Sequence, residues 1–467
     1  MGYVQGLSRD QGSLFPVSLD ELIGPEHVCR VIAAFVDRLD LKALGFARAL
    51  TKATGRPPYD PADLLMLYLY GYLNRVRSSR RLERECQRNV ELMWLLHRLT
   101  PDHKTIAEFR RCNASPLRQA GAKFVRFCAE AGLIRGEWVA VDGTKFQAVA
   151  SGKAILDAAQ RAELQAKLEQ RIAQYLQELE TADQQQGEAE VDAQALRQAL
   201  ARLQQQQSDL AQAHGGQRMH VSTEPEAVVL KGKGPGYNVQ TAVDAEHALI
   251  VAHEINAQAG DNGCLQRMGE AAQQALGATE LKLVADAGYA NGEQAQALED
   301  RGVQVHVPVK RSVNNQGDGE LLDRACFTYD AQADAYVCPA DKLLQRKQIN
   351  LKEKTVVYAA QPSDCGACSM KERCTASSRR MVTRHLYEQA LERIHQRATP
   401  TAMRLRRCTV EHPFAALKFH IFEKPRFLMR GLTGAGTEIA LATLAYNVKR
   451  ALAVLGGRHM LQKLALP

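Results

Sequence analysis

Residues 138–150, WVAVDGTKFQAVA, are the stretch that decides the fold of this chain. The segment is rich in valine and aromatic residues, which favours a strand. Farther along, the patterns predict two strands at 236–257 joined at the turn DAEH, single strands at 279–290 and 303–311, and helices at 265–277 and 291–302. This order of elements is typical of a mixed sheet covered by helices.

The order strand, strand, strand, helix, strand, helix, strand matches the RNase H-like fold, and we predict an α/β domain of this class over residues 136–455. Two insertions interrupt it. Residues 155–214 are rich in Gln, Ala, Leu and Glu and carry two apolar helical faces, which predicts an antiparallel helical hairpin. Two roles are open for this hairpin, a dimerisation arm or a structural insert. The second insertion, 318–382, contains a cysteine cluster.

Residues 1–130 are predicted to form a separate helical domain. Residues 28–41 and 61–76 place apolar residues at helical spacing, and Asp60 can cap the second helix. Another helix can begin at Asp102 or Thr105. Arginines near helix starts, including Arg80 and Arg81, favour a DNA-binding module. The alternative is a helical scaffold with a solvated basic face.

The composition describes a basic protein with a sizeable core. The chain has 467 residues, 45% of them hydrophobic, and a formal net charge of +8. Basic residues cluster at 75–88, 231–233, 310–311 and 404–449, which suits a surface that follows a phosphate backbone, although solubility alone also explains this charge. The first residues lack an apolar signal-peptide core, and no uncharged stretch reaches the length of a membrane span. We therefore expect a cytoplasmic protein with no membrane partner.

Two aspartates follow apolar strands. Asp142 ends the strand WVAV, and Asp286 ends the strand LKLVA. A carboxylate just past a buried strand lies at the end of the sheet on a rigid support. If the two strands are neighbours, the carboxylates repel each other, and a divalent cation is the common remedy. A single Asp after a strand is usually a turn residue or a helix cap, so these two residues alone leave both interpretations open.

A third acidic residue, Glu411, lies in RRCTVEHPFAALKFH. We expect its helix to start near Thr409 or His412. Arg407 comes four residues before Glu411 and Lys418 seven after it, which predicts that the three side chains lie near one helical face. Taken alone, the pattern also fits an ordinary surface helix with salt bridges.

Taken together, these segments resemble the DDE transposases of bacterial insertion sequences, in the branch whose last acid lies in a Tyr-x2-Arg-x3-Glu-x6-Lys signature. Arg407, Glu411 and Lys418 match that spacing, while Arg404 stands where the tyrosine is usual, which leaves the role of this position open. The segments AVDGTKF, PGYNVQTAVD, VADAGY, VEHPF, RGLTGAGTEIALATLAYNVKR and PPYDPADLLMLYLYGYLNRVRSSRRLE also match. The resemblance therefore covers nearly the whole chain.

The resemblance implies a DNA strand-transfer enzyme. Asp142, Asp286 and Glu411 would be catalytic acids that hold two Mg²⁺ or Mn²⁺ ions, with Asp142 bridging both. Water would cut the DNA at the terminal inverted repeats of the element, and the freed 3′-hydroxyl would attack target DNA. The expected partners are double-stranded DNA and a second copy of the chain in a homodimer, associated with the bacterial nucleoid.

Basic and amide side chains around these acids are given supporting roles. By resemblance, Arg407 and Lys418 would grip phosphates beside the scissile bond, and Arg404, Arg80 and Arg81 would make further DNA contacts. The alternative for Arg407 and Lys418 is a salt bridge to Glu411. The amides of Asn238 and Gln240 share one face of a strand, where either support of the site or packing explains them.

The cysteine cluster consists of Cys338, Cys365, Cys368 and Cys374. A Cys-x2-Cys pair with a third cysteine after it and a fourth upstream suits a closed, structural zinc site. The alternative is a set of reduced cysteines packed as small hydrophobic residues. Cys326, flanked by Ala325 and Phe327, is predicted to be a core residue.

Two other functions compete with an active transposase. One is a DNA-binding derivative that keeps the fold without catalysis, and the other is a metal-dependent nuclease on the same sheet. No member of the acidic triad is missing, which favours the active enzyme.

Overall fold

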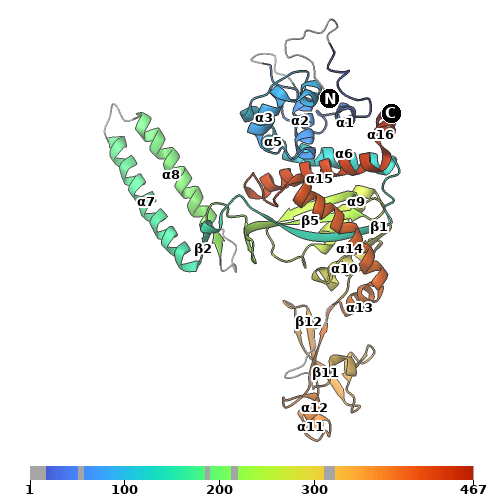
Figure 1. The fold of residues 1–467 in the computed structure, drawn as a ribbon. Coiled ribbons are helices and arrows are strands. Elements are labelled where there is room, and N and C mark those ends of the chain that lie inside the picture. Colours follow the sequence, from blue (N-terminus) through green and yellow to red (C-terminus); the bar gives the residue numbers. More distant parts are fainter. Residues whose placement is uncertain (1–16, 51–56, 185–189, 212–218, 310–320, 466–467) are drawn as a thin grey trace, which may run out of the picture.

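The computed structural model describes residues 17–50, 57–184, 190–211, 219–309 and 321–465 (Figure 1). Its centre is a six-stranded sheet with the strand order β4-β5-β1-β7-β8, in which β6 pairs with β5. Both β4 and β6 lie along the edge of β5 that faces away from β1. The strands are β1 (Trp138–Gln147), β4 (Val228–Leu230), β5 (Gly234–Asp244), β6 (Ile250–Asn256), β7 (Leu281–Val284) and β8 (Val303–His306).

The strand directions confirm the predicted fold class. β5 runs antiparallel to both β1 and β6, whereas β7 runs parallel to β1 and β8 parallel to β7. Helix α9 (Leu265–Leu276) connects β6 to β7, and α10 (Gly292–Glu299) connects β7 to β8. Three antiparallel strands followed by two parallel ones that are reached through helices are the RNase H-like arrangement.

Helix α15 (Gly431–Leu455) joins the sheet to the N-terminal helices. Every residue from Gly434 to Val448 is buried. The helix packs on β6 on one side and on α6 (Ala114–Glu130) and α2 (Pro61–Leu73) on the other, and Figure 1 shows it running between these layers. The Asn447 amide also bonds both backbone groups of Ile250, at 2.9 and 2.8 Å. One continuous hydrophobic core therefore extends from the N-terminal helices into the sheet.

The N-terminal part is helical, as predicted. Asp60 caps α2 by accepting from the backbone N–H of Ala62, and Asp102 caps α5 (His103–Cys112), so of the two predicted start residues Asp102 is the cap. Asn89 ends α3 (Ser79–Arg88) and caps α4 (Val90–Leu95). The remaining helix of this part is α1 (Val28–Asp37). The domain boundary near residue 130 stays a prediction.

The first insertion is the predicted helical hairpin. Helices α7 (Ala158–Gln184) and α8 (Glu190–Ala211) pack against each other and project from the main body (Figure 1). The short strands β2 (Ile155–Leu156) and β3 (His220–Val221) pair antiparallel at its base.

The second insertion has a sheet of its own, which the sequence patterns did not predict. Its strands follow the order β13-β12-β11-β10-β9 and are all antiparallel. A small separate hydrophobic cluster fills this unit, which lies apart from the main sheet in Figure 1. Its elements are η3 (Arg324–Cys326), β9 (Thr328–Asp330), β10 (Ala335–Val337), β11 (Leu343–Asn350), β12 (Thr355–Ala359), α11 (Pro362–Gly366), α12 (Lys371–Cys374) and β13 (Met381–His385).

The prediction for Cys326 was wrong. Cys326 is exposed, because its short turn η3 leaves the neighbouring Phe327 to fill the core of the insertion. The basic pair at 310–311 and the first residues of the predicted insertion, 318–320, lie outside the described residues.

After the insertion, the chain returns to the main sheet through α13 (Glu388–Arg397), α14 (Pro400–Ala415) and the π-helical turn η4 (Ala416–Ile421), and it ends with α15 and α16 (Gly457–Ala465). The remaining short turns are η1 (Gly152–Ala154) and η2 (Ala287–Tyr289). Among the described residues, no single helix is long and apolar enough to cross a membrane; α15 and α16 meet that test only as a pair bent by 108°.

Candidate active site

Asp142 and Asp286 come together where the parallel pairing of β1 and β7 ends. That pairing runs from Trp138↔Lys282 to Ala140↔Val284, so Asp142 lies two residues past it on β1 and Asp286 two residues past it after β7. The two strands are neighbours, as the prediction required. The side chain of Asp142 is 17% exposed and that of Asp286 is 46% exposed.

The prediction that Asp142 ends its strand was wrong. β1 continues to Gln147 because β5 pairs with it along its whole length, with Asp142 opposite Thr241. Asp286 does end its strand, and its carboxylate caps η2 by accepting from the backbone N–H of Gly288 at 2.8 Å. One carboxylate therefore lies on a paired strand and the other on a turn.

Arg406, which the sequence analysis did not select, joins the two aspartates. Its Nη2 lies 2.8 Å from Asp142 Oδ2 and 3.3 Å from Asp286 Oδ2, while its Nε is buried without a partner in the described part of the chain. Burial raises the pKa of Asp142, and the Arg406 guanidinium and the N–H of Gly143 offset that shift in part. A positive charge thus occupies the position between the two carboxylates.

A signal for Arg406 is present in the sequence. Arg406 lies four residues after Ala402 and four before Val410, and both of these face the core from α14. This spacing places Arg406 on the inner face of the helix. The signal was missed because the helix was predicted to begin too late.

Glu411 lies on α14, which packs against β1. The helix does not start near Thr409 or His412, as predicted; it starts at Pro400, because Thr399 caps it and a proline fits its first position. The Glu411 side chain is exposed, and within the described residues no hydrogen bond or ion pair joins it to Asp142 or Asp286. The structure thus places Glu411 on the helix that carries Arg406, without direct contact to the two aspartates.

The predicted basic residues near Glu411 differ in their surroundings. Arg404 and Arg407 are exposed on α14. Lys418 lies in the π-helical turn η4, so the α-helical spacing used to place it beside Glu411 does not apply there. Its Nζ lies 5.8 Å from the centre of the Phe414 ring. Burial and Lys233 lower the pKa of Lys418, and the charge of Asp142 acts against that shift.

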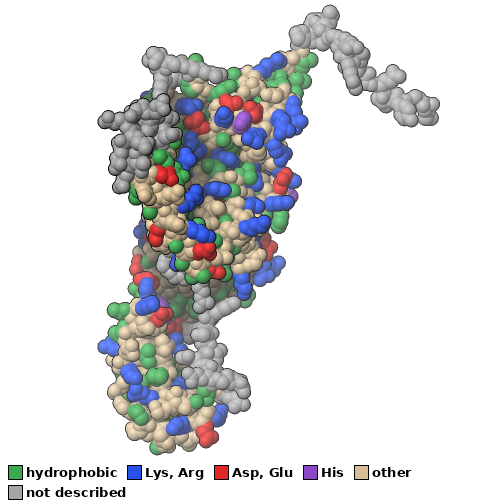
Figure 2. Space-filling model, turned by 90° about the vertical axis from the view of Figure 1, so that its left-hand side faces the viewer, with side chains coloured by type: hydrophobic (Ala, Val, Ile, Leu, Met, Phe, Trp, Pro, Cys, Tyr) green, Lys and Arg blue, Asp and Glu red, His purple; other side chains and the backbone are tan. Residues whose placement is uncertain are grey.

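Arginines of the N-terminal helices divide into structural and exposed ones. Arg80 and Arg81 are exposed on α3. Arg77 instead pairs with the fully buried Glu438 of α15 at 2.9 Å. Figure 2 shows Lys and Arg side chains spread over one face of the main body.

A buried polar network lies behind the two aspartates. Asn238 and Gln240 share one face of β5, as predicted, and are fully buried. Both amides donate to Asp261 Oδ1 at 2.7 Å, and Lys145 Nζ lies 3.2 Å from the same oxygen. The Tyr289 hydroxyl donates to Gln240 Oε1. Asp261 was not predicted, since it lies in a polar loop, NAQAGDNG, with no strand or motif to mark it.

The four predicted zinc ligands lie together in the second insertion. Cys338, Cys365, Cys368 and Cys374 line one small pocket. Backbone N–H groups of Lys342 and Arg380 donate to the sulfurs of Cys338 and Cys365, each at 3.4 Å. Burial raises the pKa of the Cys374 thiol, the positive charge of Arg380 lowers it, and the other three thiols raise it further.

Another group with metal-ligand atoms lies in the N-terminal part. His27, Cys29 and Glu91 place their ligand atoms within 4.8 Å of one another. His27 Nδ1 accepts from the N–H of Cys29, and its Nε2 lies 3.4 Å from Glu91. Burial raises the pKa of Cys29 to about 12, and the His27 side chain is already engaged as the N-cap of α1. We therefore interpret this group as a helix cap.

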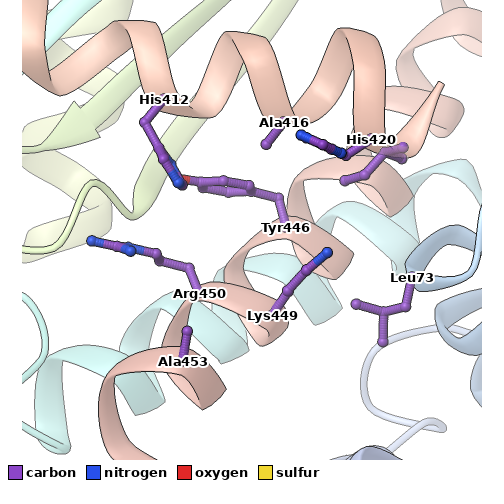
Figure 3. Close-up of a pocket in the computed structure, with 9 residues that line it drawn as sticks. Leu73, His412, Ala416, His420, Tyr446, Lys449, Arg450 and Ala453 are labelled. Carbon is purple, nitrogen blue, oxygen red and sulfur yellow. The ribbon is translucent and has the colours of Figure 1, made fainter. Parts of the chain in front are cut away.

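A cavity of about 240 Å³ lies between η4 and α15. Figure 3 shows His412, Tyr446, Lys449 and Arg450 around it. The Tyr446 hydroxyl bonds both His412 Nδ1 and the carbonyl of Ala248, at 2.9 and 2.7 Å. This cavity does not include the aspartates and is separate from the candidate site.

The donor set of the candidate site fits a divalent metal. Two adjacent carboxylates on separate segments repel each other, and the contacts of Arg406 show that a positive charge fits between them. Oxygen donors alone favour hard ions. Residues of this kind, next to exposed basic side chains, suit the hydrolysis or transfer of phosphodiesters.

Two family models match the chain. One, described as a transposase domain (DUF772), matches residues 17–112, and the other, described as a transposase DDE domain, matches residues 229–448. Asp286 and Glu411 lie inside the second match, and Asp142 lies before it. A comparison with curated proteins found no match. A solved structure of the piggyBac transposase synaptic complex with hairpin DNA is similar at 9% identity and a TM-score of 0.33, over 94% of this chain and 78% of that one.

Proposed function

Because the chain belongs to the DDE transposases, which are metal-dependent DNA strand-transfer enzymes, we propose that Asp142, Asp286 and Glu411 are its catalytic acids. The observation that carries this assignment is the meeting of Asp142 and Asp286 around one cationic group, at the end of two neighbouring strands. The metal ions are Mg²⁺, with Mn²⁺ as a substitute, because the ligands are all oxygens.

Each acid is held in a different way, which suits a division of roles. Asp142 is partly buried on a paired strand and is the ligand fixed most firmly. Asp286 lies on a turn that its own carboxylate caps. Glu411 is exposed on α14 and has the freedom to close the site when metal and DNA bind. Bound metal ions would activate water and stabilise the leaving oxygen of the cleaved strand.

Arg406 balances the charge of the acidic pair before metal binds. Two carboxylates that share a small volume disfavour ionisation of both. Arg406, at hydrogen-bond distance from each, offsets the repulsion between them. Its side chain would have to leave the position between them for a metal ion to be held there by the two carboxylates.

The proposed DNA substrate is the terminal inverted repeats of an insertion sequence. Lys418 lies in the turn η4, which continues directly from the helix of Glu411, and we assign it to a phosphate beside the scissile bond. Arg404 and Arg407 are exposed on the same helix as Glu411 and extend this contact. Arg80 and Arg81, exposed on α3, contact DNA farther from the cut.

Pairing two ends before joining them to a target requires two active sites, so we propose a homodimer that acts at the nucleoid. We also assign the enzyme to the branch with the Tyr-x2-Arg-x3-Glu-x6-Lys signature. Arg407, Glu411 and Lys418 stand at its spacing, with Arg404 at the tyrosine position.

Cys338, Cys365, Cys368 and Cys374 are proposed to hold a structural Zn²⁺. They line one pocket, and backbone N–H groups donate to two of the sulfurs, the kind of hydrogen bond that orients metal ligands. Three of the four also pack against the small core of the insertion, so a metal here would act as part of that core.

The test is strand cleavage on DNA that carries the gene's own flanking ends. Wild-type protein is compared with Asp286→Ala, in Mg²⁺ and then in EDTA. Asp300→Asn, at the exposed end of α10, serves as the matched control. Cleavage at the ends that requires both Mg²⁺ and Asp286 is the expected result. Specific binding without cleavage by the wild type would instead favour a silent DNA-binding protein, and cleavage without preference for the ends would favour a nuclease.

A further inference from the structure

Asp261 collects three side-chain donors from two neighbouring strands. Lys145 reaches its Oδ1 from β1, and Asn238 and Gln240 reach the same atom from β5. The two amides are fully buried, so water cannot replace these bonds. A charged acceptor with several buried donors forms a stiff network, because breaking any bond leaves an unsatisfied polar group.

The network lies directly against the backbone that carries Asp142. A Cβ on Gly143 would lie 2.3 Å from Gln240 Nε2 and 2.6 Å from Asp261 Oδ1. These distances are too short for real contacts, so only glycine at position 143 lets the network reach the strand. Asp261 thereby sets the position of β1 at the residue next to Asp142.

The same network reaches Asp286 through Tyr289. The Tyr289 hydroxyl donates to Gln240 Oε1, and Gln240 Nε2 donates to Asp261. Tyr289 is the last residue of η2, the turn that Asp286 caps, and its ring is fully buried. Since Asp286 lies beyond the end of β7, this anchor replaces the strand pairing that fixes Asp142.

We propose that Asp261 is a positioning residue that sets the separation of the Asp142 and Asp286 carboxylates and hence their affinity for metal. The relay Asp261–Gln240–Tyr289 holds the turn of Asp286, and the contact with Gly143 holds the strand of Asp142. This inference rests on the proposed function, because it concerns the same metal ligands. Residues that orient metal ligands typically change affinity or activity by about 10- to 100-fold when they are removed.

The test measures Mn²⁺ affinity of the full chain without DNA, by electron paramagnetic resonance and calorimetry. Asp261→Ala is expected to bind Mn²⁺ about 10- to 100-fold more weakly than wild type, with an unchanged number of ions. Tyr289→Phe, which cuts only the last link, is expected to give a smaller loss. The double variant should be no weaker than Asp261→Ala, because both changes interrupt one relay.

Asp244→Asn is the matched control. Asp244 is buried on β5, the strand that carries Asn238 and Gln240. It accepts hydrogen bonds from the backbone N–H groups of Gly136 and Glu246, each at 3.0 Å, and does not contact the network. We expect this variant to lose thermal stability and to keep the Mn²⁺ affinity of the wild type. If Asp261→Ala does not fold, Asp261→Asn and Tyr289→Phe carry the same comparison.

Three results would overturn the positioning role. They are wild-type affinity in Asp261→Ala and Tyr289→Phe, additive losses in the double variant, or one bound ion fewer in Asp261→Ala, which would make Asp261 a ligand. A wild type that binds no Mn²⁺ overturns the proposed function together with this inference. If the wild type binds Mn²⁺ and both variants bind it equally well, this inference alone is overturned.

Discussion

The carboxylate pair and the cysteine cluster lie in hydrophobic cores of very different size. Asp142 and Asp286 lie on the large core that runs from the N-terminal helices into the sheet, and Arg406 pairs with both carboxylates. The cysteines belong to a unit whose described part has a core of seven buried residues, and three of the four cysteines pack against it.

The difference suits the two uses of metal that are proposed for this chain. In the sheet, a bound metal would add chemistry to carboxylates that lie on a large hydrophobic core. In the insertion, the hydrophobic core is too small to supply much stability by itself, so a bound metal would be a structural element. Removing metal should therefore stop catalysis at one site and unfold the other.

The largest effect expected is on catalysis by Asp142→Asn. Cleavage of end-containing DNA should fall by at least about 1,000-fold, because a metal ligand is lost while the shape is kept. Since burial raises the pKa of Asp142, the ionised form is disfavoured in the fold, and the metal-free variant should melt no lower than wild type at pH 7. Cleavage assays and calorimetry measure the two quantities. A variant that melts well below wild type would mean that this carboxylate is structural.

The second prediction concerns Cys365→Ser. Loss of one thiolate should release the zinc and unfold the insertion, while β1 and β5 stay protected. Hydrogen exchange followed by mass spectrometry resolves the two regions, with fast exchange expected over β10–β12 only. Cys326→Ser, which changes an exposed cysteine of the same unit, is the control and should leave exchange unchanged. Equal protection of the amides in both variants would mean that no metal stabilises the insertion.

A smaller effect is expected from Arg406→Met. Without the guanidinium the two carboxylates repel each other, and the metal-free protein should lose about 3 kcal/mol of unfolding free energy. Mn²⁺ should then raise the melting temperature more in the variant than in wild type, because the ion takes over the lost charge. Arg407→Met, an exposed neighbour on the same helix, is the control. The same Mn²⁺ response in both variants would contradict the role given to Arg406.

The smallest effect is a pH dependence of the main sheet. Burial lowers the pKa of His253 on β6 to about 4, so the unfolded chain binds a proton more readily than the fold between pH 6.5 and 4. The free energy of unfolding should therefore decrease as the pH is lowered, by at most about 2 kcal/mol between pH 8 and pH 5. Urea unfolding of wild type and His253→Gln measures it, and the variant should show a flatter profile. An identical slope would assign the acid sensitivity to other groups.

The order of β1, β5, β6, β7 and β8 along the chain was predictable because each of these strands has its own local pattern, and the position of Asp286 followed from the end of one such pattern. The three-residue β4 was not predicted. Local patterns do not report pairing, however. The sequence WVAV looks complete before Asp142, and only the pairing with β5 extends the strand to Gln147. Arg406 and Asp261 were not predicted for a related reason, since the partners that each one contacts lie far away in the sequence.

The strands of the insertion were missed for another physical reason. β9 and β10 have three residues each, too few for an alternating pattern, and β11 is mostly exposed. Such strands depend on their neighbours more than on their own composition. The cysteine spacing was visible in the sequence, whereas the sheet that supports it was not.

The short pairing of β2 with β3 has a consequence for how this chain can change over evolution. Ile155 stands opposite Val221, so the two ends of the hairpin leave and re-enter the body side by side. An arm that starts and finishes at one point can be lengthened, shortened or exchanged for another without altering the path of the chain through the sheet. The pairing therefore permits a change in the hairpin that leaves the path of the chain around the aspartates unaltered.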